Sequence, residues 1–179
     1  MRQGLEELGL PTSQLDALAH PLGRLAELLA QWSVRMSLTA HRGAEAVVRR
    51  LILEAVALDR HLPEVSSMAD LGSGAGFPGL PIALLHPERT VTLVESRERP
   101  HHFQRAAARE LEIGNAILRL GRAEELPPEP HALVMAQAMA TPHQAVIWML
   151  PWVEPGGILA LPLSEAQPPP GSIEGIGTV

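Results

Sequence analysis

Apolar positions along the chain change their spacing near residue 65, and this change divides the predicted elements into two groups. Before it, apolar residues recur every three to four positions, the period of an amphipathic helix. The pattern predicts a helix capped by Ser13 and ending near His20, a second helix opened by Pro21, and a third over residues 44–60. Residues 35–39 show no period and predict a loop. Five apolar residues mark the second helix: Leu22, Leu25, Leu28, Leu29 and Trp32.

After residue 65, short apolar runs alternate with helical segments. Such alternation predicts a parallel sheet with right-handed crossovers, which binds ligands at the carboxyl ends of its strands. We therefore expect one α/β domain with a helical cap at 1–62, a sheet core at 63–165 and a short tail at 166–179. The predicted strands are 67–71, 90–94, 116–120, 133–136 and 158–163. Of the predicted helices, the first follows the glycine turn and ends at 86, and the others cover 100–111 and 142–150. Residues 154–157 are predicted to form a turn.

The segment that joins the first predicted strand to its helix carries glycines at alternate positions. Glycine suits a turn that needs positive φ and a close approach of ligand to backbone, although a plain strand-to-helix turn is an alternative. The pattern Asp70-x-Gly72-x-Gly74-x-Gly76 is typical of S-adenosylmethionine (SAM) methyltransferases, whereas Gly74-x-Gly76-x-x-Gly79 fits dinucleotide-binding proteins. We favour SAM, because Asp70 suits its cationic amino acid end and would repel a pyrophosphate. Asp70, Gly72, Gly74 and Gly76 are thus predicted to bind SAM.

Polar residues also follow the next predicted strands. Glu95 closes the second strand, where a carboxylate can accept both ribose hydroxyls. Glu124 follows the third strand, where an adenine amino group could find an acceptor with backbone help from Ala123, and Gln137 follows the fourth. Because the carboxyl ends of parallel strands meet at one edge of a sheet, we expect these side chains to converge with Asp70 on a nucleoside-type ligand.

Composition excludes several classes of function. The chain has 179 residues, of which 46% are apolar, enough for one domain with a core. It has no cysteine, which excludes thiolate metal sites and cysteine nucleophiles. No histidine pair has a companion set of metal ligands, so we expect no metal site. No apolar run is long enough for a membrane span and the start lacks a signal-peptide core, so we expect a cytoplasmic protein.

The net charge of −6 argues against nucleic-acid binding by the whole surface, but it permits a local basic face. All basic residues are arginines. Arg97 and Arg99 lie with His101, His102 and Arg105 around the start of the helix at 100–111, where they could hold RNA phosphate or simply be solvated. We predict substrate contacts from these two arginines and from the loop residues Arg35 and Thr39.

The residues quoted above resemble a known family. The segment from Asp70 to Pro81, the run from Val91 to Ser96, the sequence Gly121-Arg122-Ala123-Glu124-Glu125 and the sequence Pro155-Gly156-Gly157 are similar to bacterial 16S ribosomal RNA guanine-N7 methyltransferases, the RsmG or GidB family. The resemblance implies a Rossmann-like SAM methyltransferase fold and 16S rRNA or the small ribosomal subunit as partner. It places Gly72, Phe77, Ala123 and Glu124 on cofactor positions, and Ser96 beside Glu95 is predicted to join them.

The chain departs from the family's pattern on the substrate side. The family's Asn-Leu-Thr loop is Ser37-Leu38-Thr39 here, and its Lys-Arg pair is Arg99-Pro100. Four single positions also differ: Leu51 and Glu54 replace a His and an Asp, Gln137 replaces an Arg, and Pro162 replaces a Lys. Besides an active rRNA methyltransferase, the sequence is thus compatible with a non-catalytic relative that binds SAM or rRNA, or with a changed substrate. A nicotinamide-dependent oxidoreductase is disfavoured by Asp70.

Overall fold

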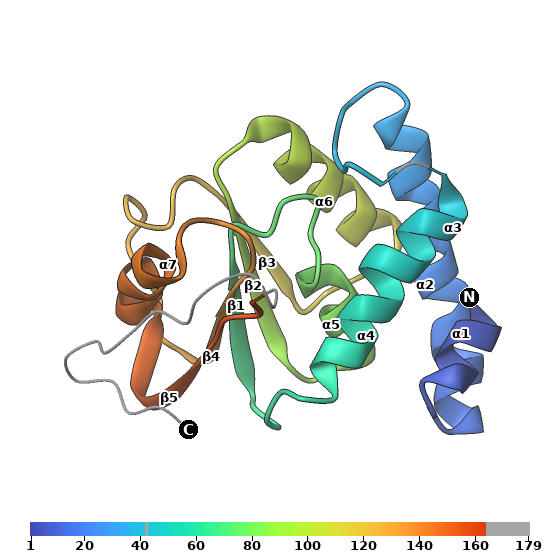
Figure 1. Cartoon of the computed structure of the whole chain (residues 1–179), viewed down its shortest axis with the longest axis horizontal. Helices are drawn as coiled ribbons and strands as arrows, with labels where there is room; N and C mark the ends of the chain where they lie inside the picture. Colours follow the sequence, from blue (N-terminus) through green and yellow to red (C-terminus); the bar gives the residue numbers. More distant parts are fainter. Residues whose placement is uncertain (42, 164–179) are drawn as a thin grey trace.

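The computed structural model describes residues 1–41 and 43–163 and contains one five-stranded parallel sheet (Figure 1). Its strand order is β3-β2-β1-β4-β5. The order reverses between β1 and β4, the place where ligands bind in open α/β sheets. The predicted parallel sheet is confirmed. The strands are β1 (Ser67–Leu71), β2 (Thr90–Glu95), β3 (Ala116–Leu120), β4 (His131–Ala136) and β5 (Val153–Ala160).

Helices cover both faces of the sheet (Figure 1). One face carries α5 (Gly79–Leu85) and α6 (Glu98–Glu110), with α2 (Thr12–Ser33) packed outside them. The other face carries α7 (Pro142–Met149), followed by the 3₁₀ turn η2 (Leu150–Trp152). A further short helix, α1 (Arg2–Glu7), packs against α2 and was not expected from the sequence.

Successive strand residues point to opposite faces, so each strand contributes to two cores. Met68 of β1 and Leu93 of β2 belong to the core under α5 and α6. Ala69 of β1 and Val94 of β2 belong to the core under α7. This alternation also directs the side chains of Asp70 and Glu95 toward the α5 and α6 face.

The prediction of two helices divided at Pro21 is wrong, because the structure has one helix, α2, in this region. It runs without interruption from Thr12 to Ser33, with Pro21 inside it and Pro11 rather than Ser13 at the N-cap. The reason is the apolar stripe, which continues across the proline and is buried throughout. Its buried leucines are Leu15, Leu18, Leu22, Leu25, Leu28 and Leu29.

The predicted helix over residues 44–60 is present as three contiguous segments. They are α3 (Ala44–Val47), the π-helical η1 (Val48–Leu53) and α4 (Glu54–Asp59). A π-helical turn holds one more residue than an α-turn and shifts the positions that follow. It lets Ile52 and Val56 remain buried in the same core as Val47.

Several element boundaries differ from those expected. The strand β2 ends at Glu95, β4 begins at His131, and β5 covers Val153–Ala160 rather than 158–163. The helix α6 begins at Glu98, two residues before Pro100, because proline is tolerated in the first helical turn. The predicted turn at 154–157 lies inside β5 as an irregularity: His131 pairs with Val153, but Leu133 pairs with Ile158. The expected tail at 166–179 lies outside the described residues. Within residues 1–41 and 43–163, no helix has the length and apolar character needed to cross a bilayer.

Candidate functional site

A hollow of about 130 Å³ lies at the carboxyl ends of β1, β2 and β3. The loop after β4 and the helix α7 close its other side. This volume is smaller than the roughly 300–1,000 Å³ of typical ligand pockets. Nine residues line it: Gly72, Val94, Ser96, Gly121, Arg122, Ala123, Glu124, Met139 and Trp148.

The glycine turn after β1 forms one wall of this hollow, and its predicted positive φ angles are confirmed. Gly72 has φ +72°, and a Cβ atom there would lie 2.9 Å from the Met139 side chain. Gly76 has φ +87°, and a Cβ there would lie 2.5 Å from Leu80 Cδ1. Both positions therefore require glycine for conformation and for space.

Asp70 lies beneath the turn rather than in the hollow. Its side chain is buried, and its Oδ2 atom accepts a hydrogen bond from the Gly79 N–H at 2.9 Å. Burial raises the pKa of Asp70 to about 7; the Gly79 hydrogen bond lowers this pKa, and the charge of nearby Glu95 raises it further. The carboxyl thus ties the end of β1 to the start of α5, and it does not face the ligand space that the sequence suggested.

Glu95 connects β2 to the glycine turn. Its Oε2 atom accepts from the Gly74 N–H at 2.7 Å, and its Oε1 atom accepts from the Arg97 N–H at 2.8 Å. The Arg97 guanidinium adds an ion pair at 3.0 Å, while its side chain remains 67% exposed. The buried carboxylate is therefore bonded to the glycine turn, and Glu95 is not among the residues that line the hollow, although its neighbour Ser96 is.

Gln104 holds the turn from α6 and was missed by the sequence analysis. Its Nε2 atom donates to Ser73 Oγ at 2.9 Å and to the Gly74 carbonyl at 2.7 Å. The residue is fully buried. In the sequence, only the position of Gln104 on the inner face of a predicted helix pointed to its burial. No local motif connects residue 104 with residue 74.

The segment after β3 supplies the opposite wall. Ala123 is buried, and its carbonyl accepts from Trp152 Nε1 at 3.0 Å. Glu124 is partly exposed and pairs with Arg122 at 2.8 Å. Burial acts to raise the pKa of Glu124, but hydrogen bonds from its own backbone and from Arg122 outweigh this, and the pKa lies below its usual value.

Not every predicted cofactor residue reaches the hollow. Gly72, Ser96, Ala123 and Glu124 line it, whereas Gly74 and Gly76 shape the turn behind it. Phe77 packs against the core beneath α5. Gln137 lies on the exposed loop directly after β4 and is not among the lining residues.

The predicted substrate residues lie on two segments. Arg35 is exposed and Thr39 is half-buried in the stretch between α2 and α3, where Thr39 Oγ1 accepts from the His41 N–H at 3.1 Å. Arg99 is exposed in the first turn of α6, just after Arg97. Their role in substrate binding stays a prediction.

Met139 and Trp148 are lining residues that the sequence did not indicate. Met139 follows Ala138, which has φ +52° although it is not a glycine. Such backbone strain is concentrated at functional sites. It turns the Met139 side chain over Gly72, where it narrows the hollow.

The hollow is lined by backbone groups, apolar side chains, the Ser96 hydroxyl, the Glu124 carboxylate and the Arg122 guanidinium. In the described part of the chain, no group of three or more His, Asp or Glu side chains is placed to hold a metal ion. The arrangement suits an organic ligand with hydroxyl and amino donors and a flat apolar part, rather than an ion.

The parallel sheet, the strand order and the glycine turn define a Rossmann-like methyltransferase fold. A solved coclaurine N-methyltransferase, bound to N-methylheliamine and SAH, superposes with a TM-score of 0.56 at 15% identity, over 89% of this chain and 57% of that chain. The chain belongs to the family of rRNA small subunit methyltransferase G, or GidB, whose model matches residues 19–164. The RsmG/GidB resemblance is confirmed.

Curated relatives agree with this family. Ribosomal RNA small subunit methyltransferase G of Xanthomonas euvesicatoria pv. vesicatoria (strain 85-10) is 40% identical over 137 residues, which is 75% of this chain and 64% of the relative. The protein of that name from Stenotrophomonas maltophilia (strain R551-3) is 39% identical over 160 residues, 89% of this chain and 73% of the relative. The chain thus spans about two thirds of the length of these relatives.

Proposed function

We propose that the chain binds SAM in the hollow and transfers its methyl group to ribosomal RNA of the small subunit, with guanine N7 of 16S rRNA as the acceptor. The observation that carries this proposal is the convergence of three strand ends on one hollow: Gly72 of the glycine turn after β1, Ser96 after β2, and Ala123 and Glu124 after β3. Glu95, next to Ser96, holds the glycine turn through the Gly74 N–H. The family and the names of its relatives support the substrate class.

In the proposed complex, the ribose lies against the Glu95 carboxylate and the adenine amino group near Glu124. Asp70 and Gln104 act as positioning residues, since they hold the turn from below and from α6. We expect Met139 to move when the cofactor enters, because its side chain lies over Gly72 in the narrow hollow.

The reaction needs few groups from the protein. Guanine N7 carries an in-plane lone pair, so it attacks the methyl carbon as the carbon–sulfur bond breaks, and that bond's electron pair stays on sulfur. No proton leaves N7, so a general base is not required. The protein then has to align N7, the methyl carbon and the sulfonium in line and to exclude water, which is catalysis by proximity and orientation.

Calorimetry with SAM, followed by transfer of a labelled methyl group to naked 16S rRNA and to small subunits, tests the proposal. We expect micromolar SAM binding and label in rRNA. As a matched pair, Glu95→Gln should weaken SAM binding because it removes the charge that accepts the hydroxyls, whereas Glu129→Gln, in the loop before β4, should leave it unchanged. No binding at millimolar SAM would reject the proposal.

A non-catalytic family member is the second candidate, and two contacts favour it. Leu51 and Glu54 stand where the family has a His and an Asp; Leu51 packs against the core, and Glu54 pairs with Arg50 at 3.3 Å. Both side chains therefore have structural partners. SAM or rRNA binding without methyl transfer in a single-turnover assay would establish this second candidate instead.

A further inference from the structure

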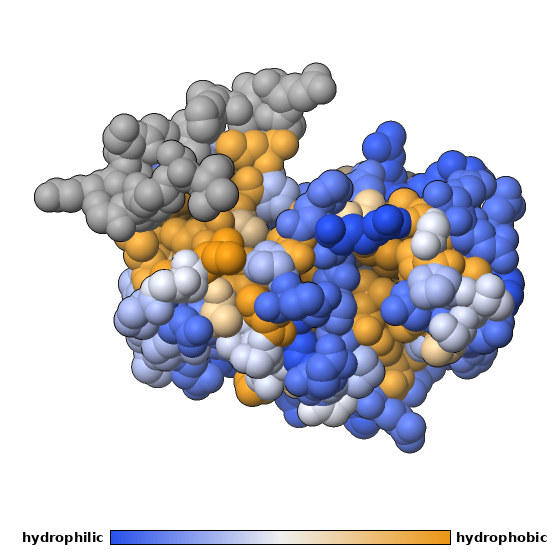
Figure 2. Space-filling model, turned by 90° about the horizontal axis from the view of Figure 1, so that it is seen from below, coloured by the Kyte–Doolittle hydropathy of each residue, from blue (hydrophilic) through white to orange (hydrophobic). Residues whose placement is uncertain are grey.

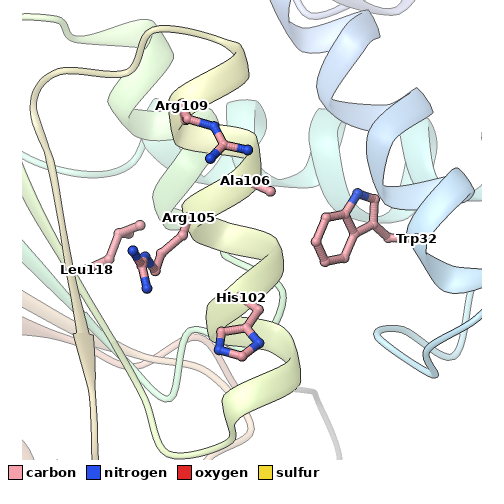
Figure 3. Close-up of a pocket in the computed structure, with 6 residues that line it drawn as sticks. All are labelled: Trp32, His102, Arg105, Ala106, Arg109 and Leu118. Atoms are coloured by element: carbon pink, nitrogen blue, oxygen red, sulfur yellow. The ribbon is translucent and has the colours of Figure 1, made fainter.

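A second and larger cavity, of about 540 Å³, lies away from the glycine turn, and the proposed methyl transfer does not use it. We call it the α6 groove. Its floor is the outer face of α6, with Trp32 of α2 on one side and Leu118 of β3 on the other (Figure 3). It is lined by Trp32, His102, Arg105, Ala106, Arg109 and Leu118.

The basic side chains of the groove lie on one helical stripe. His102, Arg105 and Arg109 follow each other at intervals of three and four residues, so they share one face of α6 over about 10 Å of helix. All three are exposed. On the inner face of α6, burial first, and then Arg105 and His102, lower the pKa of His101, whereas Glu95 raises it.

Most arginines of the described chain are neutralised by a carboxylate. Within residues 1–41 and 43–163, no carboxylate forms an ion pair with Arg105 or Arg109. The neighbouring acid, Glu110, is already paired with Arg24 at 2.6 Å. The groove is therefore a patch of uncompensated positive charge on a chain whose net charge is −6. The paired arginines are Arg2, Arg24, Arg49, Arg50, Arg89, Arg97, Arg119 and Arg122.

The aromatic side chain in the groove distinguishes the kind of polyanion. Trp32 is half-buried, packs edge-on against Phe103 at 5.7 Å between ring centroids, and points from α2 toward α6 (Figure 3). An aromatic ring beside a row of cations is the combination that binds single-stranded nucleic acid, where bases stack and phosphates pair. An acidic protein surface would use the cations and leave the ring without a partner.

We propose that the α6 groove binds a single-stranded segment of the RNA substrate, with phosphates on His102, Arg105 and Arg109 and a base against Trp32. The inference rests on the proposed function for the identity of the RNA. Because α6 begins directly after Glu95 and Ser96, an RNA strand along the helix leads toward the hollow in which SAM is proposed to bind. The groove would then provide affinity for the RNA and orient it, and methyl transfer would take place in the hollow.

The test is binding of naked 16S rRNA without cofactor, measured across a range of salt concentrations. For the double variant Arg105→Gln, Arg109→Gln, we expect about tenfold weaker binding, and a slope of log affinity against log salt that is lower by roughly 0.7 for each lost contact. The matched control is Arg60→Gln, an exposed arginine at the end of α4. It should leave both quantities unchanged, and melting curves should show that all three proteins are folded.

Other results would overturn the inference. Unchanged rRNA affinity and salt slope in the double variant would refute it, as would failure of the unmodified chain to bind naked rRNA. If the variant lost affinity for whole small subunits and kept its affinity for naked rRNA, the groove would dock an acidic ribosomal protein instead. SAM calorimetry tests the proposed function independently of the groove. The double variant should bind SAM with the affinity of the unmodified chain.

Discussion

Two buried carboxylates at neighbouring strand ends, Asp70 and Glu95, hold different parts of the same turn. Asp70 accepts one backbone N–H, whereas Glu95 accepts two and pairs with the Arg97 guanidinium. Burial disfavours the charged form of a carboxyl, and a hydrogen bond to the carboxylate favours it. For Asp70 burial outweighs the single Gly79 hydrogen bond and raises the pKa to about 7.

The raised pKa of Asp70 predicts a pH-dependent stability. The unfolded chain releases this proton near pH 3.8 and the folded chain near pH 7, so the free energy of unfolding falls as pH rises between these values. Over this whole pH range, the free energy of unfolding should fall by about 4 kcal/mol. In Asp70→Asn, which keeps an acceptor for the Gly79 N–H, this fall should disappear. Urea unfolding of both proteins from pH 4 to pH 8 measures it, and parallel curves would contradict the assignment.

Gly72 and Gly156 share a left-handed backbone but differ in their surroundings, which makes them a matched pair. Gly156 has φ +83° and nothing within 4 Å of an added Cβ, whereas at Gly72 the Cβ meets Met139. Alanine at either position should cost about 1 kcal/mol of stability. Only Gly72→Ala should also weaken SAM binding, by about tenfold or more, because it displaces Met139 into the hollow. Equal SAM affinities in calorimetry would contradict the role of Gly72.

At the scale of elements, a continuous apolar stripe outweighs a local helix breaker. Pro21 removes one hydrogen bond from α2, yet the leucines on both sides of it are buried in one core. Proline plays the opposite part in α7, where Pro142 occupies the first turn and Thr141 Oγ1 accepts from the Gln144 N–H.

These two prolines give a prediction for the helices. Pro21→Ala should raise the free energy of unfolding by about 2 kcal/mol, because it restores a backbone donor inside α2 and removes the clash of the ring. Pro142→Ala should bring no gain, since the first-turn N–H of α7 has no helical acceptor. Chemical unfolding of the two variants beside the parent chain measures both. A loss of stability in Pro21→Ala would show that the proline fits α2 without strain.

At the scale of the whole molecule, the helical cap and the sheet are tied by buried polar contacts as well as by apolar packing. Arg89, at the start of β2, is 2% exposed, donates to the Val65 carbonyl at 3.1 Å and pairs with Asp59 of α4 at 3.3 Å. His86 contacts the same carboxylate at 2.8 Å, and this hydrogen bond raises the pKa of His86. Figure 2 shows exposed apolar surface on the side where β5 and α7 lie in Figure 1. Ile158 of β5 is among the exposed large apolar residues.

We predict that the cap and the sheet unfold in one transition. Arg89→Met should lower the free energy of unfolding by about 3 kcal/mol, since it leaves a largely buried carboxylate with one partner fewer. Arg24→Met is the control, because its pair with Glu110 is more exposed and should contribute less than about 1 kcal/mol. Circular dichroism and tryptophan fluorescence should give coincident curves. Two separate transitions would show that the cap is a domain of its own.

The sequence by itself determined the order and kind of the elements, because apolar period, glycine and proline act over a few neighbouring residues. It therefore placed the strands at 67–71 and 116–120, the glycine turn, and Glu95 and Glu124 at strand ends. Only the tertiary structure decided where side chains from distant segments meet. Strand alternation and packing put Asp70 under α5, Gln104 on Gly74 and Met139 over Gly72, and they placed Trp32 and Arg105 around one groove. Such contacts depend on how the helices pack on the sheet, and a local sequence pattern does not determine this packing.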